Sequence, residues 1–147
     1  MKGNTMKAIV LAAALSLSMH AQAACLAPVS STQEVDAVVS AHGGYNVPAD
    51  ACLQIRRNRM ALEVISNVDT SQDATVAWTI IKLRDERLPI FSQSFGTTTL
   101  VGATAMNKED AAHAMAQSID MALQNFSYTE AMAQIRALRA KREIPAQ

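Results

Sequence analysis

The chain has 147 residues, of which 50% are hydrophobic, and its 13 Lys and Arg residues balance its 13 Asp and Glu residues. This length suits one ordinary domain, and the charge balance gives no electrostatic reason to expect a nucleic-acid partner. The apolar run at 8–17 is too short to cross a bilayer about 30 Å thick, which needs roughly 20 residues, and no later segment is long and apolar enough. We therefore expect no nucleic-acid binding and no spanning helix, while contact with a membrane surface remains compatible with the composition.

Residues 1–23 have the form of a bacterial secretory signal peptide. A positively charged start is followed by the apolar run at 8–17, and Ala21 and Ala23 supply the small side chains of a cleavage site. We predict that the chain is exported and that 24–147 form a single periplasmic domain.

Two cysteines follow the predicted cleavage site, Cys25 and Cys52. Two cysteines in an exported chain are a natural pair in an oxidising compartment. A disulfide between them closes a loop of about 28 residues, which stabilises a fold by roughly 3–4 kcal/mol in the chain-entropy model. The alternative is a lipid on Cys25 that anchors the protein to a membrane. Lipoprotein signals commonly have Leu three positions before that cysteine, where this chain has Gln22, so we favour the disulfide.

The first element predicted after the signal is a helix over 30–42. Ser31 or Thr32 can cap its start, and glycines at 43–44 can end it, because glycine adopts the left-handed conformation that a helix C-terminus needs. One face of this helix has the i, i+3, i+4, i+7 spacing of a buried stripe: Val35, Val38, Val39 and His42.

Three strand-like runs come next, at 60–66, 74–83 and 89–101, and 52–57 is a candidate for a fourth. They are rich in β-branched and aromatic residues, and short polar segments connect them, so we expect antiparallel pairing. In the central run, Val76, Trp78 and Ile80 share one face, and Ala77, Thr79 and Ile81 share the other. We expect the face with Trp78 to belong to the core.

The last third of the chain is predicted to be helical. Asn107 followed by Asp110 has the form of a helix start, and a second helix is expected over 128–142. The first of these helices has an apolar stripe at helical spacing: Met115, Ile119, Ala122, Leu123 and Phe126. The predicted fold class is α+β, with an antiparallel sheet of three to four strands and an N-terminal helix and C-terminal helices packed on one face.

Catalytic and metal-binding motifs are absent from the sequence. It has no HxH, HExxH or CxxC spacing and no GxSxG or SxxK, so we expect no metal, no cofactor and no enzymatic activity. We interpret His42 as a partner of a helix C-terminus and His113 as part of a solvated helix face. A small hydrolase that uses Ser94 or Ser118 with His113 is the least favoured alternative.

Two groups of residues are candidates for contact with a partner. One is a cluster of arginines before the first predicted strand, and the other is a run of hydroxyl side chains in the last: Arg56, Arg57, Arg59, Thr97, Thr98 and Thr99. The segment "RDERLP" at 84–89 and the loop 96–106 could also insert into a partner.

Part of the chain resembles a known family. The runs "ATVAWTIIKLRDERLPIFSQSF" and "EDAAHAMAQSIDMAL", within 74–126, are similar to the closing part of ABC-type transport auxiliary lipoproteins. The resemblance implies a small envelope protein that accompanies a transport system for lipids or solvents. We therefore expect an exported, non-catalytic accessory or binding protein of the bacterial cell envelope that recognises a partner protein or complex. The alternative is a periplasmic inhibitor or immunity protein that blocks an enzyme.

Overall fold

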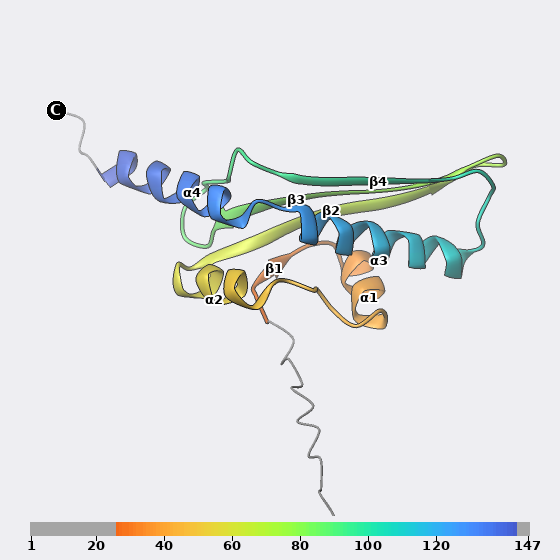
Figure 1. Ribbon diagram of the computed structural model, residues 1–147, viewed down its shortest axis with the longest axis horizontal. Helices are drawn as coiled ribbons and strands as arrows, with labels where there is room; N and C mark the ends of the chain where they lie inside the picture. The colour runs from red at the N-terminus through yellow and green to blue at the C-terminus, as the bar shows by residue number, and fades with distance from the viewer. Residues whose placement is uncertain (1–25, 144–147) are drawn as a thin grey trace, which may run out of the picture.

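The computed structural model describes residues 26–143, so the predicted signal peptide and Cys25 lie outside the described part of the chain. Figure 1 shows the long strands running along the molecule, with α1, α2 and α3 below them in this view. In chain order the elements are β1 (Val29–Ser30), α1 (Gln33–Ala41), α2 (Ala49–Arg57), β2 (Met60–Thr70), β3 (Thr75–Asp85), β4 (Gly96–Gly102), α3 (Lys108–Asn125) and α4 (Tyr128–Glu143).

The strands form one sheet in the order β1-β2-β3-β4. β2, β3 and β4 are antiparallel, as predicted, with Ile81 paired to Val64 on one side and to Gly96 on the other. β1, which was not predicted, pairs with β2 in parallel through Val29 and Leu62. Parallel neighbours need a crossover connection, and α1 and α2 supply it. The fold is α+β as expected, but the sheet is mixed and not purely antiparallel.

Two predicted strands are wrong in part or in whole. The segment 52–57 belongs to helix α2, because Cys52 and Ile55 lie three residues apart and are both buried on one side of it. The last strand, predicted over 89–101, begins only at Gly96. Before that, the chain makes an isolated bridge between Phe91 and Arg84 and is otherwise irregular.

The predicted core face of β3 is also wrong. Residues 75–85 alternate strictly, and the buried positions include Ala77, Thr79 and Ile81, whereas Val76 and Trp78 on the opposite face are only half-buried. A threonine can occupy the core because the Thr79 hydroxyl hydrogen-bonds with the Ser118 hydroxyl of α3, with the oxygens 2.6 Å apart. A buried polar group costs little when it is hydrogen-bonded. The face with Thr79 can therefore lie in the core, and the face with Val76 and Trp78 is left uncovered.

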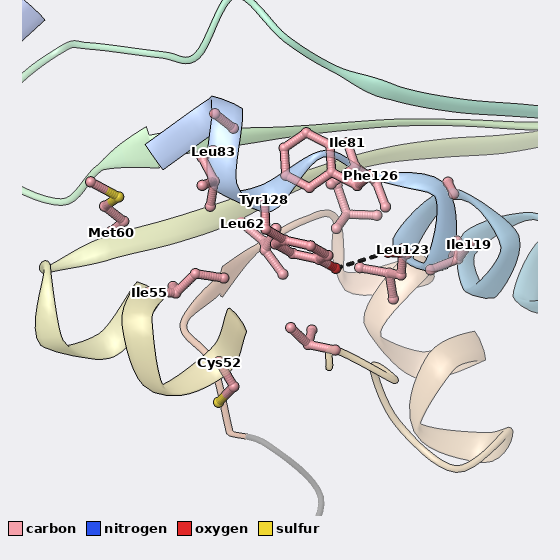
Figure 2. Close-up of a cluster of buried hydrophobic side chains, with 14 of the residues drawn as sticks. Cys52, Ile55, Met60, Leu62, Ile81, Leu83, Ile119, Leu123, Phe126 and Tyr128 are labelled. Carbon is pink, nitrogen blue, oxygen red and sulfur yellow. Dashed lines mark hydrogen bonds between the residues drawn. The ribbon is translucent and has the colours of Figure 1, made fainter. Parts of the chain in front are cut away.

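The core lies between this sheet face and the helices. Figure 2 shows Ile55, Leu62, Leu123 and Tyr128 converging from four different elements. The Tyr128 hydroxyl donates to the Leu123 backbone oxygen at 3.0 Å, which satisfies it inside the cluster. The wider cluster also contains Val35 from α1, so residues from all four described helices contribute to one buried cluster.

The predicted capping residues and the stripe of the first C-terminal helix are confirmed, although α1 begins at Gln33 and not at 30. The Thr32 side chain accepts a hydrogen bond from the Val35 amide at 3.3 Å, and the Asn107 side chain accepts one from the Asp110 amide at 2.9 Å. All five stripe residues of α3 and its C-cap, from Met115 to Phe126, are buried.

The start of β4 is fixed by close contact with the end of α3. A Cβ built on Gly96 would lie 2.9 Å from the Ala122 backbone oxygen and 3.2 Å from the Phe126 Cβ, neither of which can move freely. We expect Gly96→Ala to lower the free energy of unfolding by about 1–3 kcal/mol, as overpacked cores do. Urea denaturation of the Gly96→Ala variant and of the unsubstituted protein measures this loss of unfolding free energy.

Gly102, at the other end of β4, is the matched control. Its added Cβ would meet the terminal methyl of Met106 at 2.7 Å, which is the end of a flexible side chain. Because that methyl can move and alanine also restricts the unfolded chain, Gly102→Ala should change stability much less. Equal losses at the two glycines would show that the packing of β4 on α3 is not as described.

Candidate functional site

The uncovered face of the sheet is the first candidate surface. Its members follow from the cross-strand register and lie opposite the helices. We call this set the open face: Glu63, Ile65, Asn67 and Asp69 on β2, Val76, Trp78, Ile80, Lys82 and Arg84 on β3, and Thr97, Thr99 and Val101 on β4.

Apolar side chains on the open face meet water. Ile65 is 44% exposed and Val101 is 71% exposed. Ile65 pairs with Ile80, and next to them Trp78 lies between Asn67 and Thr99. A contiguous apolar patch with polar neighbours is typical of a contact surface, whereas single exposed apolar residues are ordinary.

One end of the open face combines a cation with aromatic rings. Arg84 pairs with Phe91, which is 44% exposed, and Phe95 directly before β4 is 60% exposed. Within residues 26–143, the buried Nε of Arg84 has no hydrogen-bond partner. A buried donor without a partner is unfavourable, and because this nitrogen is buried, only a movement of the Arg84 side chain would bring it to an acceptor on a partner.

The edge of β4 is the second candidate. β4 is the terminal strand of the described sheet and forms its upper border in Figure 1. It has no charged residue and no proline, and Thr97, Thr98 and Thr99 occupy its first half after Gly96. Natural proteins usually protect an edge with charges, proline or a covering element. Because β4 has neither a charged residue nor a proline, its backbone groups can pair with an extended segment of a partner.

The predicted arginines lie elsewhere. Arg56 and Arg57 are the last residues of α2, and Arg59 forms the turn into β2 with a left-handed φ of 51°. All three are exposed. This turn lies beside Asp85 at one end of β3, whereas Thr97–Thr99 pair with residues in the middle of that strand. The structure therefore does not bring the two predicted contact groups together.

The turn after Asp85 protrudes and is fixed in place. One carboxylate oxygen of Asp85 accepts from the amides of Arg87 and Leu88, at 2.8 and 3.2 Å. The other side of this carboxylate forms an ion pair with Arg139 of α4. Residues 86–89 are all exposed, so "RDERLP" ends in a short, rigid loop that a partner can reach.

The candidate hydrolase residues are not brought together. Ser118 is fully buried and donates to the Met115 backbone oxygen at 2.8 Å, and Ser94 accepts from Gln134 at 2.7 Å. In the described part of the chain, His113 has no hydroxyl or carboxylate hydrogen-bond partner and instead lies against His42, with ring centres 5.6 Å apart. Sequence spacing could not reveal this pair, because the two histidines come from different helices.

A groove of about 710 Å³ lies between α2 and the start of α4. Its lining includes Phe126, Tyr128 and Met132, with Asp50 and Glu130 as its charged members. Burial raises the pKa of the Tyr128 hydroxyl, and that hydroxyl is already bonded to the core backbone. The lining of the groove is therefore mainly apolar, and the Tyr128 hydroxyl is not free to act in it.

Residues 26–143 contain no group of three or more His, Cys, Asp or Glu side chains placed to hold a metal ion. Over the same residues, no helix has the length and apolar character needed to cross a membrane.

Comparisons with family models, with curated proteins and with solved structures find no match to this chain. The resemblance of 74–126 to transport auxiliary lipoproteins therefore stays a prediction. The open face and the β4 edge are the surfaces best placed for contact with a partner.

Proposed function

We propose that this chain is an exported, non-catalytic accessory protein of the bacterial cell envelope that recognises a partner through the open face and the adjoining β4 edge. The observation that carries the proposal is the difference between the two faces of the sheet. All four described helices share one face with the core, and the opposite face leaves Ile65, Trp78 and Val101 in contact with solvent.

The proposed mode of binding is addition of a strand. An extended partner segment would pair with the backbone of β4, and alternate side chains of that segment would lie over the open face beside Thr97, Thr99 and Val101. Backbone pairing supplies affinity, and contact with the apolar patch supplies specificity. The partner segment that fits is apolar, because Ile65 and Val101 are exposed on this surface.

The resemblance to transport auxiliary lipoproteins makes an envelope transport complex the expected partner. The predicted export signal is consistent with a periplasmic location for this encounter. Anchoring through a lipidated Cys25 is the alternative, and it would place the same surface at a membrane.

We predict that the mature chain begins at Ala24 and contains a disulfide between Cys25 and Cys52. Cys52 is buried in the core from α2, so a bond to it would attach the start of the mature chain to the domain. Intact-mass measurement before and after reduction should show a gain of two hydrogen masses. A diacylglycerol adduct on Cys25 would contradict this and favour the anchored form.

Charge substitutions on the proposed surface test the function. Thr99→Lys and Val101→Lys place a cation on exposed positions of the open face, where it opposes apolar contact and edge pairing. We expect each variant to lower recovery of the partner from a cross-linked envelope fraction at least tenfold. Gln124→Lys, an exposed position on α3, is the matched control and should leave recovery unchanged.

If all three variants recover the partner equally, the open face and the β4 edge are not the recognition surface. The identity of the partner separates the candidate functions. A component of a membrane transport complex supports the accessory function, and a soluble hydrolase supports the inhibitor.

The inhibitor is kept as a second candidate because of the rigid loop at 86–89. Two backbone amides bound to Asp85 hold this loop in one conformation, and a pre-organised loop loses little entropy on insertion into an active site. If the protein is an inhibitor that inserts this loop, Leu88→Asp should abolish recovery of the partner. Val101→Lys should then leave recovery unchanged.

A further inference from the structure

Two histidines from different helices lie side by side. His42 is the C-cap residue of α1, and His113 lies in the second turn of α3. Their ring centres are 5.6 Å apart, and their planes are tilted by 47°. Two imidazoles bound to one metal through nitrogens about 2 Å from it have ring centres about 5 Å apart. The observed separation is therefore close to that of two ligands of a shared ion.

The ring of His42 makes a hydrogen bond of the kind that metal-binding histidines make. Its Nδ1 lies 2.7 Å from the Val38 backbone oxygen. A carbonyl oxygen can only accept, so Nδ1 carries the proton, and Nε2 of the neutral ring keeps its lone pair. Metal-binding histidines typically donate their second ring N–H to a carbonyl or carboxylate in this way, which fixes the tautomer and the ring orientation.

His113 is available as the second ligand. Over residues 26–143, neither of its ring nitrogens has a hydrogen-bond partner. Both histidines are exposed, so an ion can enter from solvent and water can complete its coordination. The packing of α1 on α3 already holds the two histidines close together, because Val35, Val39 and Ile119 belong to one buried cluster. Metal binding therefore needs little further ordering of the two helices.

The surroundings of the pair favour a cation. Asp110 lines one shallow pocket with His113, and Asp120 lines another with His42. Asp120 is held by the Asn46 side chain, which donates to its Oδ1 at 3.1 Å. These carboxylates are not placed as ligands with the histidines, but their negative charge lowers the energy of a positive ion nearby.

From this geometry we infer that His42 and His113 form a two-histidine site for a divalent transition metal, for which Cu²⁺ is the tightest-binding ion. Imidazole nitrogen suits copper, nickel and zinc, and Cu²⁺ has the highest affinity of the divalent first-row series. The bound ion would join the end of α1 to α3. This site lies on the helical side of the molecule and is independent of the proposed recognition surface.

Titration of Cu²⁺ alone into the untagged, oxidised mature protein tests the inference. Calorimetry in a buffer that does not coordinate copper should show one site, and electron paramagnetic resonance should show two nitrogen ligands from imidazole. We expect His42→Gln and His113→Gln each to weaken binding at least tenfold. Gln124→Ala, on an exposed part of α3, should leave it unchanged. The double histidine variant measures background binding elsewhere, such as at the chain terminus.

Thermal unfolding supplies an independent readout. An ion that binds only the folded chain raises the melting temperature, and the stabilisation grows with the logarithm of the ion concentration divided by the dissociation constant. Saturating Cu²⁺ should therefore raise the melting temperature of the unsubstituted protein by more than that of either single variant. Equal affinity in the unsubstituted protein and the double variant, or a nitrogen signal that survives in the double variant, would overturn the inference and leave the ring contact as packing alone. Circular dichroism confirms that the variants are folded.

Discussion

Replacing Ile81 with alanine should lower the free energy of unfolding by about 2–5 kcal/mol, the range for truncation of a fully buried aliphatic side chain. The same change at the preceding residue, Ile80, should cost only about 1 kcal/mol or less, as expected away from the core. Ile81 is fully buried against the helices, and Ile80 is half-buried on the open face. The two residues are chemically identical neighbours on one strand, so each is a matched control for the other.

Urea denaturation of the two variants gives both free energies. The predicted order depends only on which face of β3 the helices cover. A larger loss for Ile80→Ala would mean that the face with Trp78 is the core after all, and the open face would then not exist as a binding surface.

Replacing Arg139 with methionine should lower the free energy of unfolding by about 3–5 kcal/mol at neutral pH, the cost of leaving a buried charge without its partner. The Asp85 side chain is fully buried, and Arg139 is its ion-pair partner. Arg139 also donates to the Asn58 backbone oxygen at 2.8 Å, which ties α4 to the turn before β2. Arg136→Met is the matched control, since Arg136 is exposed and makes only a long contact of 3.4 Å with the Asn58 side chain.

The pH dependence of this loss follows from the pKa of Asp85. Burial by itself raises that pKa, but hydrogen bonds from Arg139 and from the amides of Arg87 and Leu88 lower it overall. A carboxyl group with a lowered folded-state pKa contributes stability above its unfolded pKa of about 3.9, and that stability is lost as the pH falls through the folded-state pKa.

The loss caused by Arg139→Met should therefore be full at pH 7. It should begin to shrink below about pH 4, where Asp85 of the unfolded chain takes up a proton, and continue to shrink as the pH falls through the lowered folded-state pKa of Asp85. Chemical denaturation at several pH values measures it. A loss that is the same at pH 7 and pH 3 would show that Arg139 stabilises α4 by packing and not by its charge.

The helices that carry complete local signals could be predicted from the sequence. Asn107 has a carboxylate three residues later and a long apolar stripe after it, and the structure places the start and buried face of α3 as expected. Helix α1 is similar, with Thr32 as its cap. In both cases the hydrogen bonds and the periodicity are local, so no knowledge of the rest of the fold was needed.

The core face of β3 could not be predicted, because both faces contain apolar residues. Which face is buried depends on Thr79. The core can hold this residue because its hydroxyl forms a hydrogen bond with the hydroxyl of Ser118, which lies far along the chain. Thr75 is similar: it is buried, and its hydroxyl accepts from the Met106 amide at 2.9 Å. The hydrogen-bond partners of both threonines lie far along the chain, so the pattern of β3 alone could not show that this face is the buried one.

The prediction of a strand over 52–57 is wrong for a related reason. The run is too short for the spacing of its apolar residues to distinguish a helix from a strand. What decides its structure is the burial of Ile55 in the core cluster, which the sequence does not show. The pair formed by His42 and His113 depends in the same way on the packing of two helices that no local pattern joins.

Site-specific photo-crosslinking in intact cells is the most direct test of the central claim, that this protein acts by recognition through the open face and the β4 edge. A photoreactive phenylalanine analogue at Thr99 should join the chain to one defined envelope protein, and the same analogue at Gln124 on the helical side should not. Adducts of equal yield at both positions, or an adduct only at Gln124, would contradict the account.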